Sequence, residues 1–440
     1  MEPIFQNMII YYISLGLRVL RNNVFLTTIT IMSLALGIGA CITALTVLHV
    51  LSSDPVPKKS GQLYYVRIDP TGANGYAKGE TVPAPMMTYV DAANIIGANK
   101  ALASTAVALT PAKITSSLVG LRPLFSEAVT TTSGFFSLFD ARFLYGAGWS
   151  VKDDSGSSRV VVISKDMNDR LFQGRDSVGQ TLRVNNVDLQ VVGVLEDWSP
   201  QPRFYAVSLS RRNYGGGDGI FMPLSVSLDT KMTPENVSCY GNADISQLRA
   251  APCMFLGVWT QLDNERAVES YKIYLSNYVH EQIASGRFVR NTFGVSSLHD
   301  WMKENRVIPD DVRVQVWIAI GFLVICVVNA IGLLLAKNLR RMSEYAVRRA
   351  LGASRGELFT QIVAEGAIVG LAGGMLGLFF AEAGLYAVRH EPAQYASLAT
   401  LDLSMFLATF CVSLLAGLLA SILPALRACV AAPAPYLKAS

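Results

Sequence analysis

Four long apolar runs stand out from the pattern of hydrophobic and polar positions along the chain. They cover roughly residues 24–51, 314–336, 358–388 and 403–426, and the first contains no Asp, Glu, Lys or Arg. An α-helix needs about 20 mainly apolar residues to cross the hydrocarbon core of a bilayer. The pattern therefore predicts an integral membrane protein with four transmembrane helices.

The first run allows a second interpretation. Ile38-Gly39-Ala40-Cys41 is similar to the cleavage box of a bacterial lipoprotein, in which Cys41 would carry the lipid. The apolar run continues beyond Cys41 to Leu51, however, so the segment is long enough to stay in the membrane as a span. We therefore expect a transmembrane helix here.

Basic residues predict the orientation of the spans, because Lys and Arg are retained on the cytoplasmic side. They lie before the first run, between the second and third, and after the fourth, whereas Arg389 stands alone between the third and fourth, offset by Glu391 and Asp402. The basic set is Arg18, Arg21, Lys337, Arg340, Arg341, Arg348, Arg349, Arg355, Arg427 and Lys438. Both termini are therefore predicted to be cytoplasmic.

This orientation gives a complete predicted organisation. It consists of a cytoplasmic segment 1–23, a helix 24–51, a periplasmic domain 52–313, a helix 314–336, a cytoplasmic segment 337–357, a helix 358–388, a short periplasmic loop 389–402, a helix 403–426 and a cytoplasmic tail 427–440.

The large domain between the first two spans alternates between strand and helix patterns. The clearest predicted elements are strands at Arg159–Ile163, Thr181–Val184 and Val187–Leu195 and helices at Lys165–Phe172 and Glu265–Ile283. Asn185-Asn186 tolerates the positive φ of a tight hairpin, and Ser164 is a good N-cap. We expect an α+β domain of two subdomains.

Composition excludes several classes of function. Hydrophobic residues make up 51% of the chain and charged residues 16%, and the net charge of +4 is small and scattered, so no nucleic-acid partner is expected. No HExxH or GxSxG motif occurs, and four dispersed histidines without a CxxC predict no metal site. We expect no catalytic residues, and the outer domain is expected to bind a partner or transmit force.

Two of the six cysteines, Cys239 and Cys253, lie in the outer domain with a short loop between them. In an oxidising compartment they could form a disulfide, and the alternative is two unpaired buried thiols. The remaining cysteines lie in or beside apolar runs, where their small, soft side chains pack well.

A short amphipathic segment, Ser343–Leu351, joins the second and third spans. Tyr345, Ala346, Val347, Ala350 and Leu351 supply apolar contacts, Arg348 and Arg349 supply charge, Gly352 ends the segment, and Ser354 can cap the next helix. Such a helix can dock into a groove of another protein or lie on a lipid surface, and composition leaves both alternatives open.

Polar residues also lie inside the spans. Glu365 is either functional or paired with a nearby Arg, and we favour pairing. Asn329 can donate a hydrogen bond across helices or back to its own helix. Gln361 lies near Glu365 on the same run. Glycines at 366, 370, 373, 374 and 377 are expected to allow close helix packing.

The segment Glu344 to Ser354 closely resembles the signature of the FtsX-like permease family. Further similarity lies at Val328–Gly332, at Gln361 and Glu365, at Gly373–Gly377 and at Leu423–Arg427. In the outer domain, residues 134–136, 161–164, 170–172, 178–182 and 191–194 resemble successive markers of the MacB-type periplasmic core. The pattern departs from the family at Ala431-Ala432-Pro433, where an Asp-Pro is usual.

The resemblance implies the permease subunit of an ABC transporter in a bacterial inner membrane. Its contact with a separate ATPase would be made by Glu344, Tyr345, Val347, Arg348, Arg349, Leu351, Gly352 and Ser354. No GxxxxGK[ST] occurs and the fused ATPase domain of MacB is missing from the sequence, so ATP and Mg²⁺ are expected on the partner subunit, with no cofactor bound by this chain.

The family further implies a homodimer or a heterodimer with a related permease, in contact with membrane lipid, and in some systems a periplasmic adaptor and an outer-membrane channel. The expected function is mechanotransmission that drives efflux or extraction of an amphiphile such as a drug, lipid, peptide or lipoprotein. The alternative is a transmitter that regulates an extracytoplasmic enzyme without transport.

Overall fold

The structure is a computed structural model that describes residues 24–71, 82–115, 122–240 and 243–430. The predicted segment 1–23, most of the predicted tail, and the residues Arg18, Arg21, Ala431–Pro433 and Lys438 lie outside the described residues. The chain divides into two compact units, one made of Ser53–Ile308 and the other of the residues on either side. Each unit is described by itself.

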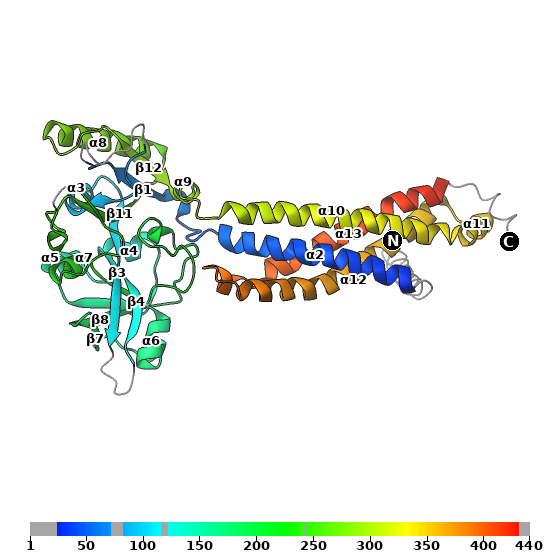
Figure 1. The fold of residues 1–440 in the computed structure, drawn as a ribbon, viewed down its shortest axis with the longest axis horizontal. Helices are drawn as coiled ribbons and strands as arrows, with labels where there is room; N and C mark the ends of the chain where they lie inside the picture. The colour runs from blue at the N-terminus through cyan, green and yellow to red at the C-terminus, as the bar shows by residue number, and fades with distance from the viewer. Residues whose placement is uncertain (1–23, 72–81, 116–121, 241–242, 431–440) are drawn as a thin grey trace, which may run out of the picture. The chain divides into compact units, whose positions relative to one another are not determined.

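Four long helices form the second of these units, which we call the helical unit, and Figure 1 shows them side by side. Each is long and apolar enough to cross a membrane, as the sequence predicts. They are α2 (Val24–Ser52), α10 (Asp310–Leu339), α12 (Arg355–Arg389) and α13 (Leu403–Val430), joined by α11 (Met342–Ala350) and the 3-10 turn η5 (Ala396–Leu398). Cys41 is buried within α2, which continues to Ser52.

Small residues let the helices approach closely. Along α12, Gly366, Gly370 and Gly374 face Ser421, Gly417 and Ser413 of α13. A Cβ on Gly370 would lie 2.5 Å from the carbonyl oxygen of Ser413 and 2.7 Å from the Cα of Gly417. Gly373 and Gly377 face α2 in the same way. The predicted packing role of these glycines is confirmed, because small residues let two helix backbones come together.

The helical unit buries a narrow core and exposes a broad apolar surface. Its buried cluster is Leu34, Ile38, Ile42, Ala330, Leu334, Val369, Ala381, Ala416 and Ala420. Large side chains such as Trp317, Met375 and Phe379 are instead about 70% exposed. Apolar groups on the outside are what a lipid solvent requires, so this surface fits burial in a bilayer.

The unit Ser53–Ile308, which we call the outer domain, is built on one twelve-stranded sheet in the part that the structure describes. Its strands are β1 (Leu63–Ile68), β2 (Met87–Thr88), β3 (Ala103–Thr115), β4 (Leu124–Thr131), β5 (Phe143–Gly146), β6 (Val160–Ile163), β7 (Thr181–Val184), β8 (Val187–Leu195), β9 (Ile220–Pro223), β10 (Ser238–Cys239), β11 (Cys253–Gln261) and β12 (Phe293–Ser297). Its helices are α3 (Tyr89–Gly97), α4 (Gly134–Leu138), α5 (Val151–Gly156), α6 (Lys165–Phe172), α7 (Leu224–Asp229), α8 (Glu265–Ala284) and α9 (Leu298–Glu304), with 3-10 turns η1 (Ser60–Gln62), η3 (Phe204–Ala206) and η4 (Ile245–Gln247).

The main path of the sheet runs β12-β1-β11-β3-β4-β9-β6-β8-β5, mostly antiparallel, with β4–β9 and β6–β8 parallel. The predicted β7–β8 hairpin is confirmed, and Asn185 and Asn186 have φ of 45° and 70°, as a tight turn of this kind needs. The side chain of Ser164 accepts a hydrogen bond from the backbone N–H of Met167, which confirms it as the N-cap of α6.

Two hydrophobic clusters lie along the sheet. One packs β1, β3 and β11 against α3 and α8, and the other packs β4 and β6 to β9 against α6. Aromatic rings such as Phe135, Phe139, Tyr205 and Trp259 pack against one another with centroids roughly 5–6 Å apart. Because one sheet runs through both clusters, the two predicted subdomains stay a prediction.

Cys239 and Cys253 lie directly opposite each other on the antiparallel strands β10 and β11. The structure joins them in a disulfide with an S–S distance of 2.00 Å. Of the other cysteines, Cys41, Cys326 and Cys429 are buried free thiols and Cys411 is exposed.

Candidate functional site

The predicted amphipathic segment forms α11, and the sequence explains both of its ends. Gly352 adopts a φ of +106°, which L side chains rarely adopt, so the helix stops there as predicted. Ser354 accepts a hydrogen bond from the backbone N–H of Glu357, and the Glu357 carboxylate accepts one from the backbone N–H of Ser354. This reciprocal capping starts α12 at Arg355, shortly after α11 ends at Ala350.

One face of α11 packs into the helical unit. Tyr345 is 1% exposed, and with Met342 it lies against Leu358 and Ile362 of α12. Ala346 is 4% exposed. The hydroxyl of Tyr345 donates to Oδ1 of Asn338 at 3.2 Å. The structure thus uses Tyr345 and Ala346 to hold α11 in place and leaves neither free for a partner.

The opposite face of α11 is open. Val347 is 47% exposed and Leu351 is 84% exposed, and Ala350 beside them is exposed as well. Gly352 and Ser354 are exposed as well and continue this surface. Arg349 is less exposed, because it is half-buried. A projecting apolar group at a helix end is what docking into a groove requires. We call Val347, Ala350 and Leu351 the α11 knob.

Five polar side chains form a closed ring between α11 and α12. Arg341 lies 3.1 Å from both Glu344 and Glu365, and Glu344 lies 2.8 Å from Arg348. Arg348 donates to Oε1 of Gln361 at 3.0 Å, and Gln361 donates to Glu365 at 3.2 Å. The structure therefore brings four of the predicted residues together with Arg341. We call this set the α11–α12 ring.

The ring is partly removed from water. The side chains of Arg341 and Glu365 are each 9% exposed, and such charges are tolerated when they are paired and hydrogen-bonded. Burial raises the pKa of Glu344, but the hydrogen bonds and charges of Arg341 and Arg348 outweigh it and hold the pKa below its ordinary value. Glu365 is paired with a nearby Arg, which is the interpretation that the sequence favoured.

Two family models match the chain. A model described as MacB-like periplasmic core domain matches residues 27–270, more than half of the chain, and one described as FtsX-like permease C-terminal matches residues 316–433. The chain belongs to the MacB/FtsX-like permeases. It is therefore a transmembrane component of an ABC transporter, and α11 lies within the FtsX-like part.

Solved structures are similar to part of this permease. The periplasmic region of MacB from Actinobacillus actinomycetemcomitans is 13% identical and covers 58% of this chain and 96% of its own, with a TM-score of 0.37. The extracellular domain of the noncanonic ABC-type transporter YknZ from Gram-positive bacteria is 12% identical and covers 53% and 98%, with a TM-score of 0.36. No curated protein matches the chain.

Asn329 lies apart from the ring on this permease. It is exposed on α10, and its side chain makes no hydrogen bond to another residue that the structure describes. Neither of the two hydrogen bonds expected from the sequence is present in this single chain. A polar amide on the apolar surface of a span is costly unless another group satisfies it.

Sequence reasoning missed two basic residues of the permease as site residues. Arg341 closes the ring, and Lys337, 2% exposed, donates to the hydroxyl of Thr27 on α2 at 3.2 Å. Both were counted only as charges that set orientation. A signal was present, because Lys337 comes directly after the apolar run 314–336 and Arg341 follows about one helical turn later. Glu365 supplies a matching negative charge in the next apolar run.

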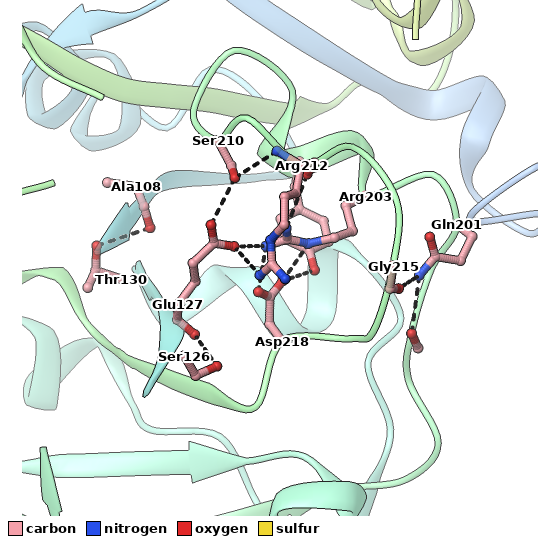
Figure 2. A network of polar contacts seen from close by, with 12 residues as sticks. Ala108, Ser126, Glu127, Thr130, Gln201, Arg203, Ser210, Arg212, Gly215 and Asp218 are labelled. Carbon is pink, nitrogen blue, oxygen red and sulfur yellow. Dashed lines mark hydrogen bonds and ion pairs between the residues drawn. The ribbon is translucent and has the colours of Figure 1, made fainter. Parts of the chain in front are cut away.

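A second polar cluster, also missed from the sequence, lies in the outer domain (Figure 2). Arg203 is 1% exposed and lies 2.5 Å from Asp218 and 3.0 Å from Glu127 of β4. The hydroxyl of Tyr205 donates to Asp218, and Arg212 lies 2.9 Å from Glu127. These contacts fix the long segment between β8 and β9 onto the sheet.

Charge controls the ionisation of this outer cluster. Burial opposes ionisation of Glu127, but hydrogen bonds from Glu235 and Arg212 and the positive charge of Arg203 lower its pKa to about 2. Burial and the neighbouring Glu127 instead raise the pKa of Glu235. Glu235 is therefore protonated before Glu127 as the pH falls, and we interpret the cluster as a structural clamp.

Proposed function

We propose that this permease relays ATP-driven motion from a separate ATPase subunit, which carries ATP and Mg²⁺, to its outer domain. The relay would drive efflux or extraction of an amphiphilic substrate such as a drug, lipid, peptide or lipoprotein. The observation that carries the proposal is the division of α11 into an exposed knob and a face fastened to α12. A push on the knob would move the start of α12.

The ring supports transmission rather than chemistry. It fastens α11 to Gln361 and Glu365, about two and three turns into α12, so the two helices would move together. Helix α12 then continues without interruption to Arg389, and its glycines interlock with α13. Mechanical coupling needs stiff elements with a contact that has two discrete states, and the close helix packing supplies the stiffness.

We further propose that the permease spans a bacterial inner membrane with both termini in the cytoplasm. The basic residues that surround α11 support this orientation, because Lys and Arg are retained on the cytoplasmic side. The knob would then face the compartment that contains ATP, and the outer domain would face the periplasm.

A second permease subunit would pack on α10. Ile318, Gly321, Ile325, Val328 and Gly332 repeat every three and four residues, and the three large ones are about 60% exposed. A Cβ on either glycine would meet no atom within 4 Å. This spacing is that of a helix–helix seam. The neighbouring amide of Asn329 would find a partner there. A cysteine at Val328 should cross-link two chains, whereas one at Leu323, which packs beside Gly37 of α2, should not.

The docking proposal is tested by replacing Leu351 with Asp. We expect the variant to insert normally but to lose the ABC ATPase that co-purifies with the wild type in mild detergent. Leu403, 74% exposed at the start of α13, is a matched control, and Leu403→Asp should keep the ATPase. Retention of the ATPase by Leu351→Asp would place the interface elsewhere.

A further inference from the structure

The helical unit contains an apolar groove that the proposed function does not use. It has a volume of about 310 Å³ and lies where α10 ends, α11 begins and α13 ends. Its lining residues are Leu335, Asn338, Leu339, Met342, Pro424, Arg427, Ala428 and Val430. Six of these eight side chains are apolar, so the groove favours a hydrocarbon occupant over water.

The sequence of α13 explains why the groove is there. Pro424 lies inside this helix, where it cannot donate a backbone hydrogen bond and its ring crowds the preceding turn. Ala428, one turn later, has a side chain too small to fill the space toward Leu335 and Leu339 of α10. The groove therefore follows from a proline and a small residue on adjacent turns.

Two polar groups in the groove have unused hydrogen-bonding capacity. The guanidinium of Arg427 makes no ion pair or hydrogen bond within the part of the chain that the structure describes. Asn338 is only 4% exposed, and its Oδ1 accepts from Tyr345, yet its amide nitrogen has no such partner either. Both are donors, and the positive charge of the guanidinium favours an acceptor that carries negative charge.

We propose that the groove is a binding site for one anionic phospholipid, with an acyl chain between α10 and α13 and the phosphate near Arg427 and Asn338. The apolar walls match the chain, and the two unpaired donors match the phosphate oxygens. The groove lies at the same end of the helices as the basic residues around α11, and anionic lipids collect at the leaflet that faces such residues.

The site reaches the coupling machinery through residues already described. Oδ1 of Asn338 accepts a hydrogen bond from Tyr345, whose aromatic side chain lies beside the α11–α12 ring. Met342, the first residue of α11, lines the groove. A bound lipid would therefore contact α11 at Met342, on its buried face. The lipid is independent of the ATPase, so the site can be tested on the permease alone.

The test is a titration of the full-length permease in detergent with dioleoylphosphatidylglycerol, followed by native mass spectrometry. We expect one lipid that binds more tightly than the rest, and weaker binding of zwitterionic phosphatidylcholine. Arg427→Gln should weaken the first phosphatidylglycerol about five- to tenfold, because a basic residue near an anionic surface contributes about 1 kcal/mol. Arg340→Gln is the matched control, since Arg340 is exposed nearby but does not line the groove.

A second variant tests the apolar part of the groove. Leu339 is 58% exposed, so Leu339→Trp can fill the groove without disturbing the buried core, and it should remove the tight lipid. Binding of phosphatidylglycerol by Arg427→Gln with wild-type affinity would overturn the proposal. Equal losses in Arg427→Gln and Arg340→Gln would overturn it too, because they would show attraction by net charge and no specific site.

Discussion

Helix α12 carries two acidic residues that each pair with an arginine, and together they test whether distance or burial determines the strength of an ion pair. Glu365 lies 3.1 Å from Arg341, and Glu382 lies 2.5 Å from Arg389. Distance alone ranks the Glu382 pair as the stronger. Exposure reverses the order, because both side chains of the Glu365 pair are 9% exposed, against 52% for Glu382 and 25% for Arg389.

The expected magnitudes follow from the change in solvation. Breaking a buried ion pair leaves one charge without compensation and costs about 3–5 kcal/mol, whereas an exposed pair contributes about 0–1 kcal/mol. In Glu365→Gln the amide can still hydrogen-bond, and Arg341 keeps Glu344 at 3.1 Å. We therefore expect a loss near the lower limit, about 3 kcal/mol, for Glu365→Gln and under about 1 kcal/mol for Glu382→Gln.

Equilibrium unfolding of the purified permease in mixed micelles, followed by tryptophan fluorescence and circular dichroism, measures both losses. A third variant separates lost charge compensation from lost packing. Arg341→Met combined with Glu365→Leu removes both charges but keeps apolar volume, and such replacements of buried pairs are often neutral. Similar losses for Glu365→Gln and Glu382→Gln, or no recovery in the double variant, would refute this account of the ring.

Three further perturbations have expected outcomes. Gly370→Ala should cost about 1–3 kcal/mol in thermal or denaturant unfolding, because the new Cβ meets the α13 backbone, whereas Gly356→Ala on the same helix meets only a side-chain oxygen at 4.0 Å and should not destabilise. Since the folded pKa of Glu127 is about 2 against an ordinary 4.5, its contribution is complete above about pH 4.5 and is lost as the pH falls toward 2, and Glu127→Gln should flatten that part of the pH–stability curve. The disulfide joins Cys239 and Cys253, which are 14 residues apart in the sequence. Reducing it should lower the free energy of unfolding of the outer domain by about 3 kcal/mol, measured by unfolding with and without reductant.

The sequence predicted those features that depend on neighbours along the chain. The length of an apolar run predicts a span, the pair Asn185-Asn186 predicts the β7–β8 hairpin, and Gly352 and Ser354 predict where α11 stops and α12 starts. In each case the physical cause lies within a few residues. No knowledge of the packing between helices or strands was needed.

Features that depend on distant neighbours could not be predicted in the same way. Arg341 and Glu365 are 24 residues apart, and Glu127 and Arg203 are 76 apart. The first pair meets because α11 folds back against α12. The second meets because β4 pairs with β9, whose preceding segment carries Arg203. Such contacts require the angle between helices or the order of strands, and an isolated charge in the sequence encodes neither.

The two faces of α11 show where the sequence pattern assigned apolar contacts imprecisely, while docking on a partner stays a prediction. An amphipathic helix of nine residues has apolar groups for one interface, and the pattern alone assigned Tyr345 and Val347 to the same one. The structure separates them, with Tyr345 1% exposed against the bundle and Val347 47% exposed on the knob. A coupling element needs both contacts, because a helix that bound only its partner would slip against the bundle, and one that bound only the bundle would receive no force.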